Sequence, residues 1–112
     1  MSLLNVTRRD SATGPILEIS GELDHATASQ LRERVTRLRL QPGKLLVLDL
    51  AGMEFCDSSG ISVLIAARNH AQALRADVAL AAVPAHTLRV LRIVGLDQVF
   101  AIHPDSDTTS PA

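Results

Sequence analysis

The chain has 112 residues, a formal net charge of -1, 46% hydrophobic residues and 21% charged residues. This length suits one domain and is too short for two separate cores, and the composition excludes an intrinsically disordered chain. The near-neutral charge, with two phenylalanines and no tryptophan or tyrosine, provides neither electrostatic attraction nor stacking surfaces for nucleic acid.

Membrane insertion and secretion are also disfavoured by the sequence. No apolar run approaches the roughly 20 residues of a membrane helix, and the N-terminus lacks the basic start and apolar stretch of a signal peptide. The single cysteine, Cys56, excludes an internal disulfide and has no second ligand at zinc-binding spacing. We therefore expect a cytoplasmic protein with no membrane partner, in which Cys56 is a small buried apolar residue.

The first two expected elements are short strands. Leu4 and Val6 alternate with polar residues, a turn-forming stretch ends at Gly14, and residues 16–19 are again mostly apolar. This pattern predicts an opening pair of antiparallel strands.

A helix is expected next, from about residue 27 to residue 40. Its first four residues, Thr-Ala-Ser-Gln, have the form of a capping box. Leu31, Val35 and Leu38 then fall on one helical face, and the Pro-Gly pair at 42–43 would end the helix.

The most continuous apolar segment spans residues 45–50. Such a run is typical of a strand that is covered on both faces, in the interior of a parallel sheet. A helix with one broad buried side is expected from Ser58 to about Leu74, and another short buried strand over residues 78–83.

A third helix is expected to begin at Pro84. Leu88, Leu91 and Val94 would line one face of this helix, and Gly95 fits a left-handed C-cap. A last short strand is expected over residues 99–102.

Strands that alternate with helices predict an α/β fold, with a mostly parallel, mixed β-sheet of about five strands packed with three to four α-helices. The folded domain is expected to span residues 1–103. Residues 104–112 have no apolar anchor, so we expect a flexible C-terminal tail.

Loops that follow the strands of such a sheet gather at the carboxyl ends of those strands. Residues 21–24 and residues 51–60 should therefore be neighbours, and both stretches are rich in glycine and polar residues. This end of the sheet is the predicted location of the functional site.

The run Asp57-Ser58-Ser59-Gly60 lies where an apolar strand passes into a helix, so one of the two serines is expected to be the N-cap. A helix N-terminus also favours a phosphate, because its free backbone N–H groups and dipole are positive. A phosphoserine there would place a charge of about -1.5 to -2 beside Asp57 and near Asp24. A protein partner could touch that surface.

Two other kinds of site were weighed against this one. A serine hydrolase would use Ser58 as nucleophile, His25 as base and Asp24 or Asp57 as the orienting carboxylate. Hydrolases of the sharp-turn type, however, have a glycine on both sides of the serine in a Gly-x-Ser-x-Gly motif, whereas this turn has aspartate before the serine and no evident oxyanion loop. The histidines lack metal-binding spacing and no P-loop is present, so we expect no enzyme activity, no metal ion and no cofactor.

Three motifs together resemble the anti-sigma factor antagonists, which are bacterial proteins made of a single STAS domain. They are Gly-Glu-Leu-Asp at 21–24, the block at 48–61 that contains Phe-Cys-Asp-Ser-Ser-Gly-Ile, and Val-Gly-Leu-Asp-Gln-Val-Phe at 94–100. The motifs occur in the family's order over roughly residues 3–103. The resemblance implies a STAS fold for the domain.

In that family the unphosphorylated antagonist binds an anti-sigma factor and so releases a sigma factor. The anti-sigma factor is a serine kinase that phosphorylates the antagonist and drives it off, and a metal-dependent phosphatase of the PP2C type resets it. The resemblance implies that Ser58 is the phosphoacceptor, that Ser59 supports the cap and that Asp57 shapes the turn. The implied partner-binding residues are Glu22, Asp24, Asp57, Ser58, Ser59, Gly60 and Ile61. The chain itself would be a monomer or weak dimer.

Two residues depart from the family pattern. Cys56 replaces a bulkier apolar residue, and Ser62 stands where a small residue usually follows Ile61. The departures leave an alternative open, a STAS subunit of a lipid-transport or stress-signalling scaffold complex without a phospho-switch. The presence of both Asp57 and Ser58 favours the regulatory function. We then expect phosphorylation to act by local repulsion and steric exclusion, with little change in fold.

Overall fold

The computed structural model describes residues 4–106, which form one mixed five-stranded sheet with the strand order β1-β2-β3-β4-β5. Strands β1 and β2 are antiparallel, and β2, β3, β4 and β5 are mutually parallel. The strands are β1 (Leu4–Ser11), β2 (Gly14–Leu23), β3 (Leu45–Cys56), β4 (Asp77–Ala81) and β5 (Ala101–His103).

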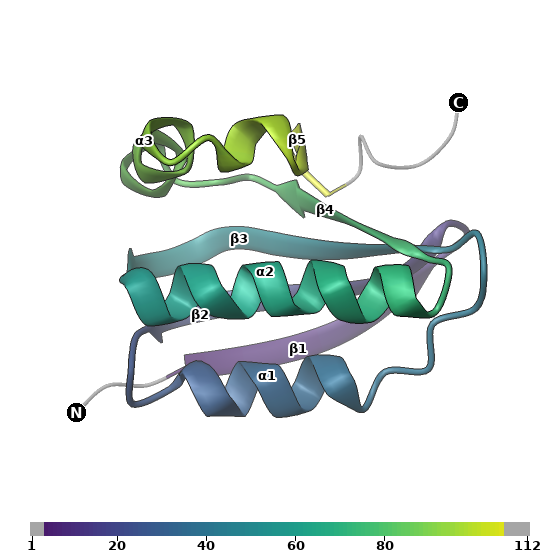
Figure 1. The fold of residues 1–112 in the computed structure, drawn as a ribbon. Helices are drawn as coiled ribbons and strands as arrows, with labels where there is room; N and C mark the ends of the chain where they lie inside the picture. Colours follow the sequence, from purple (N-terminus) through teal and green to yellow (C-terminus); the bar gives the residue numbers. More distant parts are fainter. Residues whose placement is uncertain (1–3, 107–112) are drawn as a thin grey trace.

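Three α-helices and one short 3-10 helix connect the parallel strands. They are α1 (Ala28–Thr36), α2 (Ser58–Ala73), α3 (Ala85–Ile93) and the 3-10 helix η1 (Leu96–Gln98). Helices α1 and α2 lie side by side over one face of the sheet (Figure 1). The predicted α/β architecture, with its antiparallel opening pair and three helices, is confirmed. Within residues 4–106, no helix is long and apolar enough to cross a bilayer.

The main core lies between the sheet and the helices. Leu17 and Ile19 of β2 and Leu48 and Leu50 of β3 point into it and meet Leu64 of α2, and each is 0 to 1% exposed. Burial of one such side chain contributes about 1.5 to 3 kcal/mol. This core fixes where β2 and β3 end, and so where the loops that follow them lie.

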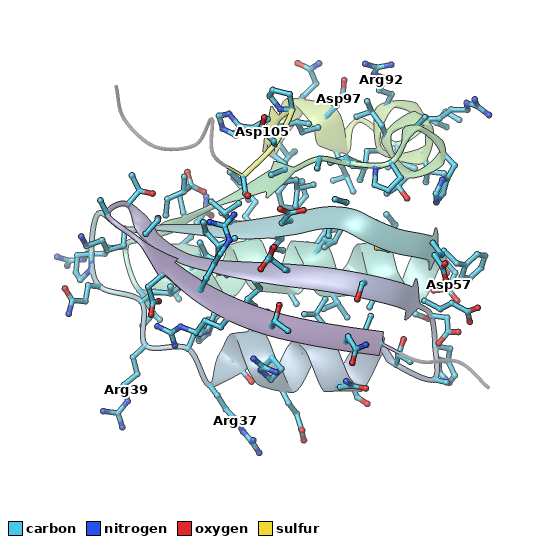
Figure 2. All side chains as sticks on the ribbon, turned by 180° about the vertical axis from the view of Figure 1, so that it is seen from behind. Arg37, Arg39, Asp57, Arg92, Asp97 and Asp105 are labelled. Carbon is cyan, nitrogen blue, oxygen red and sulfur yellow. The ribbon has the colours of Figure 1, made fainter. Side chains whose placement is uncertain are left out.

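The opposite face of the sheet carries no helix within the part of the chain that the structure describes (Figure 2). Ile16, Val47 and Ala81 form a small second cluster there. Glu18 and Asp49, which are neighbours on β2 and β3, line a polar hollow of about 310 Å3 on the sheet. The expectation that the segment 45–50 is covered on both faces is therefore wrong at Asp49 and correct at Val47.

Helix α1 is shorter than the predicted span of 27–40. The predicted capping box is absent, because the side chain of Gln30 donates a hydrogen bond to the carbonyl of Leu4, at 2.9 Å, and not back to the cap. After the helix, Leu38 and Leu40 are 8% and 6% exposed. The chain leaves the helical path there because both leucines pack against the main core.

Helix α3 buries less of its predicted face than expected. Leu91 is fully buried, but Val94 follows the end of the helix and is 57% exposed. Gly95 has the predicted left-handed conformation, with φ of 81°. The strands expected at 78–83 and 99–102 are β4 and β5, with bounds shifted by one or two residues.

The C-terminal segment is described as far as residue 106. Ser106 is 6% exposed, and Arg9 of β1 donates a hydrogen bond to its hydroxyl. Ser106 is thus held to β1, whereas residues 107–112 of the predicted tail lie outside the described residues. The domain boundary at residue 103 stays a prediction.

Candidate functional site

The ends of β2 and β3 lie next to each other. Leu23 and Cys56 are paired in the parallel register, and the N–H of Asp57 donates to the carbonyl of Leu23, at 3.2 Å. The loop that contains Asp24 and the turn that contains Ser58 therefore meet, as the sequence predicts. We call this region the site end of the sheet; Asp57 marks it in Figure 2.

The turn at the start of α2 is fixed by Asp57. Its Oδ1 accepts hydrogen bonds from the N–H groups of Ser59, at 2.9 Å, and Gly60, at 3.1 Å. Asp57 is therefore the N-cap, and the prediction that one of the serines takes this position is wrong. A carboxylate accepts both bonds at once, and its charge is favoured at the positive end of the helix.

The side chains of the two serines do not cap helix α2. Ser58 is exposed and Ser59 is half-buried, and within residues 4–106 neither hydroxyl has a hydrogen-bond partner. The hydroxyl of Ser62 donates to the carbonyl of Ser58, at 3.0 Å, one helical turn earlier. The side chain of Ser58 is thus presented to solvent from a well-defined backbone.

Gly60 is required by close packing under this turn. A Cβ atom on Gly60 would lie 2.7 Å from Sγ of Cys56 and 2.8 Å from both Cγ and the carbonyl oxygen of Leu23. Ile61, the next residue, packs against the main core. Of the predicted site residues, these two therefore have a structural role at the base of the turn.

The Asp24 loop is held by Thr27, which is 6% exposed. The hydroxyl of Thr27 donates to the carbonyl of Glu22, at 2.7 Å, and accepts from the N–H of Asp24, at 3.0 Å. Oδ1 of Asp24 accepts from the N–H groups of Ala26 and Thr27, at 3.0 and 3.1 Å. Sequence reasoning gave Thr27 only a capping role; the Asp-x-x-Thr spacing is the signal that could have indicated this network.

A groove of about 430 Å3 opens beside Ser58, between the start of α2 and helix α3. We call it the Ser58 groove. Val90 of α3 and Val94, the C-cap residue of this helix, form its far wall. They are 41% and 57% exposed, and the sequence analysis does not include them among the site residues. The lining residues are Cys56, Asp57, Ser58, Ile61, Ser62, Val90 and Val94.

Cys56 lies at the base of this groove and is partly buried, not fully buried as predicted. Burial, together with the negative charge of Asp57, raises the pKa of its thiol from 9.0 to about 11. The thiol therefore stays protonated at neutral pH and is a poor nucleophile.

The candidate hydrolase residues do not form a hydrogen-bonded triad within residues 4–106. His25 is exposed, and no hydrogen bond joins it to Ser58 within the described part of the chain. The same residues, 4–106, contain no group of three histidine, cysteine, aspartate or glutamate side chains that could hold a metal ion.

Charged side chains lie at both ends of the sheet, and the opposite end includes Asp10 and Asp77. Glu22, Asp24 and Asp57 belong to the site end. Figure 2 shows Arg37 and Arg39 toward the opposite end, beyond the C-terminus of α1. The site end therefore combines carboxylates with an apolar groove.

Comparison with known proteins adds independent observations. A family model described as STAS domain matches residues 4–109. The chain is 30% identical over 99 residues to the anti-sigma-F factor antagonist RsfB of Mycobacterium tuberculosis, with 88% of this chain and 80% of that protein covered. It is 29% identical over 99 residues to a STAS-domain containing protein of Pseudomonas aeruginosa, covering 87% and 97% of the two chains.

A solved structure shares the fold closely. The crystal structure of an anti-sigma factor antagonist from Mycobacterium paratuberculosis superposes with a TM-score of 0.82 and is 26% identical in sequence. The similarity covers 95% of this chain and 90% of that chain. The likeness therefore extends over nearly the whole of both chains.

Proposed function

The chain belongs to the STAS domain family, and we propose that it is an anti-sigma factor antagonist, a cytoplasmic regulatory protein and not an enzyme. In its unphosphorylated form it binds an anti-sigma factor, which releases a sigma factor. The anti-sigma factor is a serine kinase that transfers the γ-phosphoryl group of ATP to Oγ of Ser58. The new bond joins Oγ to phosphorus, ADP leaves, and the hydroxyl proton is released.

The exposed hydroxyl of Ser58 is the observation that carries this proposal. It is presented on a turn that Asp57 fixes, beside the Asp24 loop and the Ser58 groove. A kinase needs such an accessible hydroxyl, and a regulated interface needs the same residue at its surface. A phosphatase of the PP2C type would remove the phosphate by hydrolysis and restore binding.

The cap explains how a phosphate could act locally. The N–H groups of Ser59 and Gly60 already bond to Asp57, so they are not free to neutralise a phosphate on Ser58. When a partner dehydrates the site end, each like-charge pair at roughly 6 Å, with an effective dielectric of about 20, costs about 3 kcal/mol. Solvent and salt reduce this value and steric exclusion by the phosphate adds to it, so we expect affinity to fall by about tenfold to a hundredfold.

The test begins with co-purification from the native cell and phosphosite mass spectrometry, to identify the kinase. With that kinase and ATP, wild type and Ser59→Ala should be labelled and Ser58→Ala should not. Label that survives in Ser58→Ala and is lost in Ser59→Ala would move the phosphosite to Ser59. Recovery of a transporter or scaffold assembly in place of a kinase would support the alternative STAS role.

The second step compares the affinities of wild type, phosphoprotein and Ser58→Asp for the purified kinase. Ser58→Asp should reproduce part of the loss, because it adds one charge and less volume than a phosphate. Amide spectra of the free forms should differ only near the site end. Undiminished binding of the phosphoprotein would refute the switch, and spectral changes throughout the core would favour a conformational mechanism.

A further inference from the structure

We propose that the Ser58 groove receives an aliphatic side chain of the anti-sigma factor, and that this side chain has arginine or lysine neighbours in the partner. The inference rests on the proposed function and specifies its interface. It adds helix α3 to a surface for which the sequence suggested only the Asp24 loop and the Ser58 turn.

The walls of the groove supply the apolar part of this surface. Ile61 on α2 and Val90 and Val94 on α3 face the same hollow, and Cys56 forms its base. Ile93, beside them on α3, is 78% exposed. Aliphatic side chains concentrated on a short exposed helix are typical of a protein-binding surface, because isolated monomers rarely gather them in one patch.

The rim of the groove indicates the charge of the partner. Asp57 lines the groove, and Glu22, Asp24 and Glu54 lie on the same ends of β2 and β3. Among the described residues that line the groove there is no lysine or arginine, and Arg32 of α1 lines a different hollow, with His25 and Ser59. Complementary potentials across an interface then require cationic residues in the partner.

This chemistry changes the expected contribution of the phosphate. A phosphate at Ser58 is attracted, not repelled, by a cationic partner, so charge alone cannot account for release. Because Ser58 lines the groove, the phosphate would occupy or hydrate the space that the aliphatic side chain needs. Exclusion from the groove is therefore the main cause of release, and repulsion among the carboxylates of the site end is secondary.

The experiment uses the serine kinase identified by co-purification, as a purified protein, and two matched variants. Val94 and Leu74 are the C-cap residues of α3 and α2, and they are 57% and 36% exposed. Val94→Asp should weaken binding by about tenfold or more, because it places a charge in the groove. Leu74→Asp, at the opposite end of α2, should change affinity by less than about twofold.

A double variant keeps the test valid if Val94→Asp does not fold. Val90→Thr combined with Val94→Thr retains side-chain shape, adds two hydroxyls, and should still weaken binding by about threefold to tenfold. Wild-type binding should also weaken as salt rises from about 50 to about 500 mM. Binding that strengthens with salt would overturn the cationic part of the proposal.

The outcomes separate this inference from the proposed function. Wild-type binding that both groove variants leave unchanged would overturn the groove and preserve the antagonist role. A chain that binds no kinase at all would overturn the antagonist role itself. Groove variants that convert a dimer of this chain to a monomer in sedimentation, while kinase binding is unchanged, would assign the groove to a second copy and also overturn the inference.

Discussion

The two ends of the sheet depend to different degrees on the hydrogen bonds of single side chains. At the site end, side chains hold the backbone, since Thr27 ties together the residues around Asp24 and Asp57 caps α2. These side chains are few, and each makes more than one bond. A single substitution can therefore change the surface that a partner meets.

At the opposite end, backbone-to-backbone bonds join the chain segments, beside side-chain bonds of Ser11 and Lys44 at the first hairpin. The N–H of Gly43 donates to the carbonyl of Arg75, and the N–H of Leu45 donates to the carbonyl of Thr13, both at 2.9 Å. Such bonds remain when the side chains change. The contrast indicates that substitutions at the site end should affect both stability and recognition, whereas those at the opposite end should affect recognition little.

The largest expected effect compares a glycine at each end. Gly60→Ala should lower the free energy of unfolding by about 3 kcal/mol, because its Cβ would collide with Cys56 and Leu23. A Cβ atom at Gly43 would have no atom within 4 Å, and only the φ of +81° would be unfavourable for alanine. Gly43→Ala should therefore lower the free energy of unfolding by about 1 kcal/mol. Equilibrium unfolding in urea measures both. A larger loss for Gly43→Ala would contradict the contrast between the ends.

A second prediction tests how far water reaches the Cys56 thiol in the Ser58 groove. With its pKa raised to about 11 from 9.0, the Cys56 thiol should react with iodoacetamide near pH 8 about a hundredfold more slowly than an unperturbed thiol. Protein unfolded in urea should react at the ordinary rate. An apparent pKa of 9 or below for the Cys56 thiol in the folded protein would show that water solvates this thiol.

The same shift has a consequence for stability. Because the neutral thiol of Cys56 is favoured in the folded state, its contribution is fully present below pH 9.0 and is lost as pH rises toward about 11. Unfolding experiments between these pH values, with Cys56→Ala as the reference, should show a decline that the variant lacks.

The third prediction compares the two threonines at the ends of α1. Thr27→Val should lower the free energy of unfolding by about 2 kcal/mol, because it leaves the carbonyl of Glu22 and the N–H of Asp24 without their partner. Thr36 is exposed and donates only within its own helix, to the carbonyls of Arg32 and Glu33. Thr36→Val should therefore change stability by less than about 0.5 kcal/mol.

Thr27→Ser provides the control for this pair, since it keeps the hydroxyl and should restore most of the lost stability. Thr27→Val should also weaken kinase binding by more than its stability loss explains, because the Asp24 loop becomes free to move. Equal stability of the Thr27→Val and Thr36→Val variants would show that the hydroxyl network does not hold the site end.

Periodicity and turn residues were enough to predict the sheet, its helices and the meeting of the Asp24 loop with the Ser58 turn. These signals are local in sequence, and the apolar positions that they mark form the core. The end of α1 could not be predicted in this way, because it depends on the burial of Leu38 and Leu40 against distant elements. The N-cap was also ambiguous, since aspartate and serine both cap helices well and Asp57 precedes Ser58 directly.

The Ser58 groove was beyond sequence reasoning for a related reason. Val94 fits the buried helical stripe of Leu91, and only the packing of α3 near the start of α2 shows that it is exposed. The acceptor of the Thr27 hydroxyl, the carbonyl of Glu22, is likewise set by how β2 leads into α1. The sequence patterns predict where the candidate site lies, but the residues that line the Ser58 groove are determined by tertiary contacts.

The smallest expected effect separates charge from structure at the site end. Asp24→Arg should weaken kinase binding by about tenfold, because a cationic partner then meets a like charge. Asp24→Asn keeps the oxygen that accepts from Ala26 and Thr27, so it should preserve stability and weaken binding by about threefold. The measurement is affinity and association rate for each variant at low and high salt.

Asp10→Arg is the matched control for this prediction. Asp10 lies at the far end of β1, pairs with Arg8 at the surface, at 3.0 Å, and is 70% exposed, so its loss should alter neither stability nor binding appreciably. If Asp24→Asn and wild type bind equally at every salt concentration, Asp24 serves only to shape the loop. If Asp24→Arg slows association and high salt removes the difference from wild type, its charge steers the partner to the site end, and the contrast between the two ends is one of recognition as well as of structure.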